Sequence, residues 1–181
     1  MNRRAVLSLV GIMLIALIGA SGAVIHSGAQ AKDSPGCEGL AAYRSAMFAV
    51  GKAFVAQEAR DGLGPRREIT TYSSSDWTAS ANDLAAYQDD LKTVTPPDWL
   101  KTWHEVKIEG AGLGQQVSLA AANGGRFAIL AFKDPSAKLD TENTAAKEAA
   151  IKTCSDFKQF AYDWDAIDGD VNGTPVATPS D

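Results

Sequence analysis

The chain has 181 residues, of which 45% are hydrophobic, and its formal net charge is −5. This length fits one domain with a real hydrophobic core and leaves little room for a second. The acidic balance argues against nucleic acids and anionic membrane surfaces as partners, because both would repel the protein.

The first 31 residues have the composition of an export signal. Arg3 and Arg4 give a positive start, residues 5–18 are apolar and uncharged, and the segment ends in Ala29-Gln30-Ala31. Signal peptidases cut after such A-x-A patterns, so we expect a mature chain that is secreted or held in the cell envelope.

A membrane anchor is the competing interpretation of this segment. Residues 6–25 contain about the twenty mostly apolar residues that span a bilayer, and an uncleaved segment would be the chain's one contact with a membrane. Removal of residues 1–31 leaves 15 basic and 22 acidic residues, a net charge of −7. The exported part is therefore more acidic than the whole chain.

Two cysteines, Cys37 and Cys154, lie beyond the export segment. In an oxidising compartment an even pair predicts one disulfide, here between the start of the first helix and the middle of the last. The alternative is two separate buried thiols. A metal site would need more ligands than two cysteines and no nearby histidine provide.

The first two helices are predicted from apolar residues that recur every three or four positions. The first covers residues 37–60 and ends before Gly62 and Pro65, and the second runs to about Val94 after several N-cap residues at positions 73–76. Their apolar seams are Leu40, Tyr43, Met47, Val50 and Phe54, and then Trp77, Leu84, Tyr87, Leu91 and Val94. Asp83, Asp89 and Asp90 are interpreted as a solvated face of the second helix.

The longest helical pattern covers residues 96–123. Two prolines suit its first turn, and Gly124-Gly125 is a typical stop. Its apolar stripe contains Trp99, Trp103, Val106, Leu113 and Val117, and is widened by Leu100, Ile108, Ala111 and Leu119.

The segment 126–132 is apolar and bounded by turn residues, so periodicity cannot separate helix from strand. We predict a short helix, because helices flank it and no strand partner is evident. Residues 133–138, with Pro135, are predicted to be a break. A last helix then runs from Asp140 or Thr141 to Ile167, with Ala150, Cys154, Phe157, Ala161 and Trp164 on its inward face.

These elements predict an all-α fold, an antiparallel up-down four-helix bundle with a short extra helix, over residues 32–167. The four tryptophans, Trp77, Trp99, Trp103 and Trp164, are expected to form layers of one core instead of stacking on a ligand.

His104 is the one histidine outside the export segment. It could hold haem with Met47, the one methionine beyond that segment, on a facing helix, and Trp99 and Trp103 would then line the pocket. No C-x-x-C-H attachment motif and no Glu-x-x-His pair is present. The simpler interpretation is a structural histidine that hydrogen-bonds a neighbour at the edge of the seam.

The tail, residues 168–181, begins with a string that resembles the first half of an EF-hand calcium loop. Asp168, Asp170 and Asn172 would supply oxygen ligands, with Gly173 at the turn. Pro179 stands where the loop needs a bidentate carboxylate. A flexible acidic tail is therefore the competing interpretation.

The sequence thus favours a non-catalytic extracytoplasmic helical module that binds an unknown protein or small ligand and uses no cofactor, because no set of acid, base and nucleophile is indicated. The alternative is a small-molecule or haem-binding bundle built on His104 and the tryptophans. Neither reading indicates nucleic acid as a partner.

Overall fold

The computed structural model describes residues 33–63 and 68–169, and all regular structure in these ranges is helical. The α-helices are α2 (Leu40–Arg60), α3 (Ser74–Thr93), α4 (Lys101–Gly124), α5 (Lys133–Thr153) and α6 (Phe157–Gly169). The short 3-10 helices η1 (Ile69–Thr71), η2 (Asp98–Leu100) and η3 (Ala128–Phe132) lie in the connections. The predicted all-α fold is confirmed.

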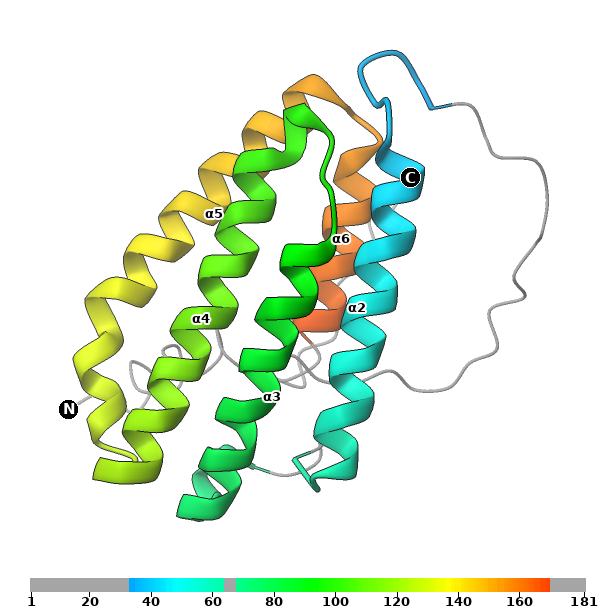
Figure 1. The fold of residues 1–181 in the computed structure, drawn as a ribbon. Helices are drawn as coiled ribbons and strands as arrows, with labels where there is room; N and C mark the ends of the chain where they lie inside the picture. The colour runs from blue at the N-terminus through cyan, green and yellow to red at the C-terminus, as the bar shows by residue number, and fades with distance from the viewer. Residues whose placement is uncertain (1–32, 64–67, 170–181) are drawn as a thin grey trace.

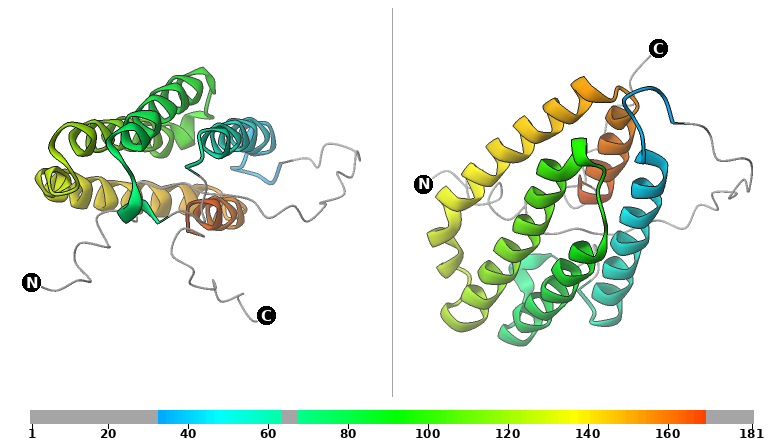
Figure 2. Two further views of the ribbon diagram at one scale, coloured as in Figure 1. Left: turned by 90° about the horizontal axis from the view of Figure 1, so that it is seen from below. Right: turned by 45° about the horizontal axis from the view of Figure 1, so that its top comes forward.

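Successive α-helices run in opposite directions, so the architecture is the predicted up-down bundle (Figure 1). From below, α5 and α6 lie on one side of the bundle and α2, α3 and α4 on the other (Figure 2). We call the end that contains Cys37 and Cys154 the disulfide end. The opposite end contains the last turns of α2 and α4 and the first turns of α3 and α5.

The start of α3 shows why sequence signals located the helices well. Ser73 Oγ accepts a hydrogen bond from the Asp76 backbone N–H, while the Ser73 N–H donates to Asp76 Oδ2. This reciprocal pair satisfies two backbone donors that a helix N-terminus otherwise leaves open. The predicted N-cap region at residues 73–76 is confirmed.

The C-terminal part differs from the prediction in two places. The predicted break at residues 133–138 is wrong, because α5 begins at Lys133 and Pro135 lies in its first turn. The first-turn backbone N–H groups have no partner within the helix, so a proline costs little there. The predicted single last helix is also wrong: it is divided at Cys154, whose extended backbone ends α5 before α6 begins.

The central pattern forms η2 followed by α4, and segment 126–132 contains η3, as the predicted short helix. The expectation that Leu119 widens the buried stripe is wrong, since its side chain is exposed. Leu119 lies two residues from both Val117 and Ala121, which are buried, and a step of two residues turns about 200° around a helix. It therefore faces away from them.

The buried side chains form two clusters and not the single core expected from the tryptophans. The larger cluster contains Trp103 and Trp164, with Trp99 packed against its edge. Trp77 belongs to a smaller cluster at the opposite end, with Val117, Ala121 and Ile129. All five residues predicted to face inward from the last helix are buried.

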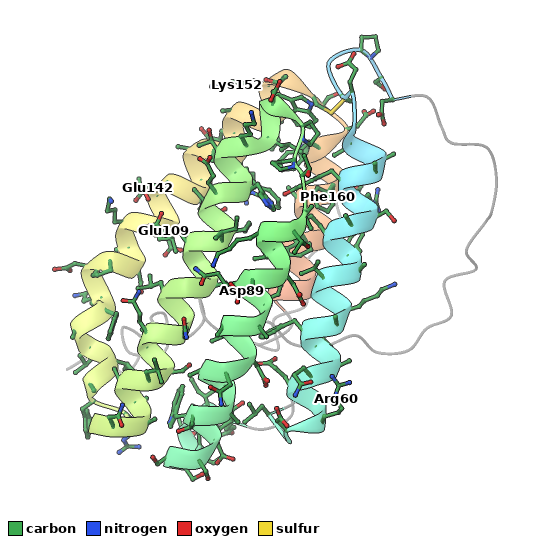
Figure 3. All side chains as sticks on the ribbon, viewed as in Figure 1. Arg60, Asp89, Glu109, Glu142, Lys152 and Phe160 are labelled. Atoms are coloured by element: carbon green, nitrogen blue, oxygen red, sulfur yellow. A yellow bond between two sulfur atoms is a disulfide. The ribbon has the colours of Figure 1, made fainter. Side chains whose placement is uncertain are left out.

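Cys37 and Cys154 are disulfide-bonded, as predicted, and both are buried (Figure 3). The bond joins the segment before α2 to the junction of α5 and α6. That segment packs closely on its neighbours: Gly36 has a φ of 83°, and a Cβ there would lie 2.7 Å from the Thr153 carbonyl oxygen. A side chain at position 36 would therefore separate the two segments that the disulfide joins.

Some sequence predictions concern residues beyond these ranges. The export segment 1–31 and the calcium-loop positions Asp170 and Asn172 lie outside the described residues, and Asp168 is in the last turn of α6. None of the helices described has both the length and the apolar composition needed to span a bilayer.

Candidate functional site

His104 is buried at the disulfide end, where it links three helices. It lies in the first turn of α4, and its Nδ1 is 2.9 Å from the hydroxyl oxygen of Tyr43 on α2. The ring also hydrogen-bonds the backbone of Leu91 and Val94 at the C-terminal end of α3. His104 therefore ties α2, α3 and α4 together.

The protonation of this group follows from its partners. Backbone carbonyls can only accept, so the imidazole nitrogen that faces α3 carries the proton, and Nδ1 accepts from the Tyr43 hydroxyl. Burial lowers the pKa of His104 and raises that of Tyr43, so both side chains stay neutral near pH 7. Both ring nitrogens are thus occupied, and neither offers a free lone pair to haem iron or a metal ion.

The other predicted site residues belong to the core around His104. Met47 and Trp103 are fully buried, and Trp99 is partly buried at the edge, where its Nε1 donates to the Glu38 carbonyl. Trp103 makes edge-to-face contacts with Tyr43, Phe157 and Phe160. The structure therefore brings His104 and Trp103 together with Tyr43, but as packed side chains.

Two buried indoles in this cluster have no hydrogen-bond acceptor, Trp103 and Trp164. Their rings lie 6.4 Å apart, and the Lys107 ammonium is 4.8 Å from the centre of the Trp103 ring. A cation over an indole face is attracted by the ring quadrupole. Lys107 thus covers Trp103 on the side of α4.

The contact between Tyr43 and His104 gives a first prediction. Tyr43→Phe keeps the ring but leaves the buried Nδ1 without a donor, which is expected to lower the free energy of unfolding by about 1–3 kcal/mol. Urea unfolding of Tyr43→Phe, His104→Gln and the double variant measures this. The double variant should cost less than the sum of the two single changes. Strict additivity would contradict the contact.

A pair of buried acids, not predicted from the sequence, lies between α2 and α3. The Glu58 side chain is 1% exposed and that of Asp83 is 5% exposed, so the interpretation of Asp83 as part of a solvated face is wrong. Asp89 and Asp90, assigned to the same face, are exposed as predicted. A signal for Glu58 was present: it follows Phe54 by four residues and so continues the apolar seam of α2.

The electrostatics of this pair are unusual. Burial, reinforced by the nearby charge of Asp83, raises the pKa of Glu58 from 4.5 to about 9. Burial also raises the pKa of Asp83 to about 6, with further contributions from the charge of Asp61 and a hydrogen bond to it. Gln57 and Arg60 act in the other direction on Asp83. Glu58 is therefore a neutral acid at pH 7, and Asp83 is mostly ionised.

The opposite end also carries exposed apolar side chains. Phe127, just before η3, is 68% exposed, and Leu130 and Leu119 are exposed as well. The guanidinium of Arg126 lies 5.2 Å from the centre of the Phe127 ring. We call these three residues, Leu119, Phe127 and Leu130, the apolar tip; they are the large hydrophobic side chains exposed in the described part of the chain.

No three His, Cys, Asp or Glu side chains within residues 33–63 and 68–164 are grouped as ligands for a metal ion. The site chemistry there consists of a neutral histidine, a buried acid pair and the apolar tip. No protein-family model, curated protein or solved structure matches the chain.

Proposed function

We propose that the chain is a non-catalytic, extracytoplasmic helical module that binds another protein through its apolar tip. The observation that carries this proposal is the exposure of Phe127. Aromatic side chains are enriched at protein interfaces, where one well-packed ring can supply much of the binding energy. Arg126, over the same ring, adds a cation that can pair with a carboxylate of the partner.

The interior of the molecule supports a binding role over a catalytic or haem-binding one. His104, the base or iron ligand that either chemistry would need, has both nitrogens engaged. Met47 is fully buried among other side chains. His104 is therefore already hydrogen-bonded and Met47 already packed within the protein, whereas the side chains of the apolar tip face solvent and are open to another protein.

Export is the second part of the proposal, and two features support it. The positive, apolar and small-residue sequence of the first 31 residues is typical of a signal peptide. The disulfide belongs to chains that fold in oxidising compartments. N-terminal sequencing of the native protein is expected to start at Lys32. A start at Met1 in a membrane fraction would indicate an anchor.

Site-specific crosslinking in the native host tests the binding role. A photoreactive phenylalanine analogue at position 127 is expected to give one discrete adduct with a partner protein. The matched control is the same analogue at Lys158, which is exposed on α6 near the disulfide end and should give no such adduct. Adding Leu130→Ser should reduce the yield at position 127.

With the crosslinked partner purified, Phe127→Ser is expected to weaken binding at least tenfold, since loss of a hot-spot residue, the role proposed for Phe127, costs about 2 kcal/mol or more. The melting temperature should stay unchanged, because the ring is exposed. Equal adducts from positions 127 and 158, or none from either, would contradict the proposed surface.

A further inference from the structure

The acid pair has a geometry that neither the fold nor the proposed function requires. Glu58 comes from the last turn of α2 and Asp83 from α3, so the two carboxyl groups lie across the contact between these helices. Within the described residues, Glu58 Oε2 and Asp83 Oδ2 have no hydrogen-bond partner. Ionisation of a carboxyl group with an unpartnered buried oxygen is disfavoured, so such a site favours a bound proton.

The end of α2 depends on the position of Glu58. The Glu58 carbonyl accepts a 2.8 Å hydrogen bond from the Leu63 N–H, which closes the chain reversal after the helix. Leu63 is buried, and its own carbonyl accepts a 3.0 Å hydrogen bond from the Tyr72 hydroxyl. A displacement of Glu58 would therefore disturb the reversal and its contact with the segment that leads to α3.

We propose that Glu58 and Asp83 form a proton-operated latch, closed when Glu58 is protonated and opened locally at the end of α2 when both carboxyl groups are ionised. Two like charges in a dry contact repel strongly, and the last turn of a helix is the part that opens most easily. Closure needs one proton, because a protonated Glu58 beside an ionised Asp83 leaves a single charge in the contact.

The charged groups around the pair set the direction of the switch. Asp61, at the C-cap of α2, adds a second negative charge beside Asp83, and Arg60 partly offsets it. Among the described residues, Asp83 is the charged neighbour that acts on Glu58. The neighbours toward the disulfide end are aromatic: the Phe54 and Tyr87 rings pack with centres 4.6 Å apart, from α2 and α3 respectively. Among the described groups, the negative charges of Asp61 and Asp83 outnumber the positive charge of Arg60, which favours the proton.

The pH window of the latch follows from the raised pKa of Glu58. The pKa of Glu58 is raised, so the stability that its proton provides is complete below its ordinary value of 4.5 and is lost as the pH rises toward about 9. Within that window each pH unit raises the opening constant by up to tenfold. His104 acts in the opposite sense at the other end: its pKa is lowered, so its contribution is lost below its ordinary value of 6.5. Because the two groups shift the stability of the whole protein in opposite directions, the opening must be measured at the end of α2 itself.

Carbon NMR of the glutamate carboxyl groups in the wild-type protein is the first test, and it needs no folded variant. The Glu58 carboxyl is expected to titrate with a midpoint above pH 7. The carboxyl of Glu109, exposed on α4, supplies an internal reference (Figure 3). A Glu58 midpoint below pH 6 would overturn the latch.

Hydrogen exchange of peptides that cover residues 55–63 then measures the opening. Glu58→Gln keeps the shape of the protonated acid, so wild type and variant should exchange alike at pH 5, and wild type at least tenfold faster at pH 9. Glu109→Gln, the same change at an exposed position, should match wild type at both values. Equal exchange of wild type and Glu58→Gln at pH 9, even with a raised midpoint, would show that the pair titrates without opening and would overturn the proposal.

Discussion

Removal of the disulfide by Cys37→Ala together with Cys154→Ala is expected to lower the free energy of unfolding by about 4–5 kcal/mol, the entropic estimate for a closed loop of about a hundred residues. The two cysteines are 117 residues apart in the sequence. The bond also fixes the segment before α2 against the end of α5, where Gly36 approaches the Thr153 carbonyl. For a domain of this size the melting temperature should fall by roughly 10 °C.

Thermal and urea unfolding of oxidised wild type, reduced wild type and the double variant measure this effect. Reduced wild type should unfold at the same temperature as the double variant, and the variant should be insensitive to reductant. Ser45→Ala, an exposed change on α2, is a control with the same final residue and should cost little. Two freely reactive thiols in the folded native protein would contradict the bond.

Local signals explain which helices could be predicted. Periodicity placed α2, α3 and α4 because each has one buried stripe, and the capping box at Ser73 is a short-range pattern. The break predicted at Pro135 was wrong because a proline is tolerated in the first turn of a helix, whereas in the interior it removes a hydrogen bond and kinks or ends the helix. The division at Cys154 could not be seen, since its sequence has no glycine or proline; there the disulfide partner and the contacts of α6 select an extended residue.

The candidate sites also depend on contacts between residues that are far apart in sequence, which local patterns do not reveal. The sequence singled out His104, but its hydrogen-bond partner Tyr43 is 61 residues away in sequence. Glu58 continues the spacing of the predicted seam beyond Phe54, yet an acid there is normally read as exposed, because burial of a charge is costly. Only the position of Asp83 on the facing helix shows that the acid is buried in a pair. The exposure of Phe127 could not be predicted from the sequence either, because composition does not reveal which face of a short apolar run meets solvent.

Trp103→Ala is expected to be among the most destabilising single substitutions in the described part of the chain, at about 3–5 kcal/mol. The Trp103 side chain is 1% exposed and contacts aromatic rings from both α2 and α6. These contacts hold α4 against two helices that lie far from it in sequence. The loss would leave a cavity that rigid neighbours can fill only in part.

The matched control is Trp99→Ala, which removes the same side chain from the edge of the same cluster. Trp99 is only partly buried, although its Nε1 donates to the Glu38 carbonyl, so its loss should cost clearly less. Urea unfolding of both variants gives the comparison, and Trp103→Phe serves if the alanine variant does not fold. If Trp103 instead lined a ligand pocket, its removal would cost no more than that of Trp99, because a pocket wall has partner atoms on one side only. A larger cost at Trp103 would therefore favour packing over ligand binding, and with it a partner-binding surface outside the core.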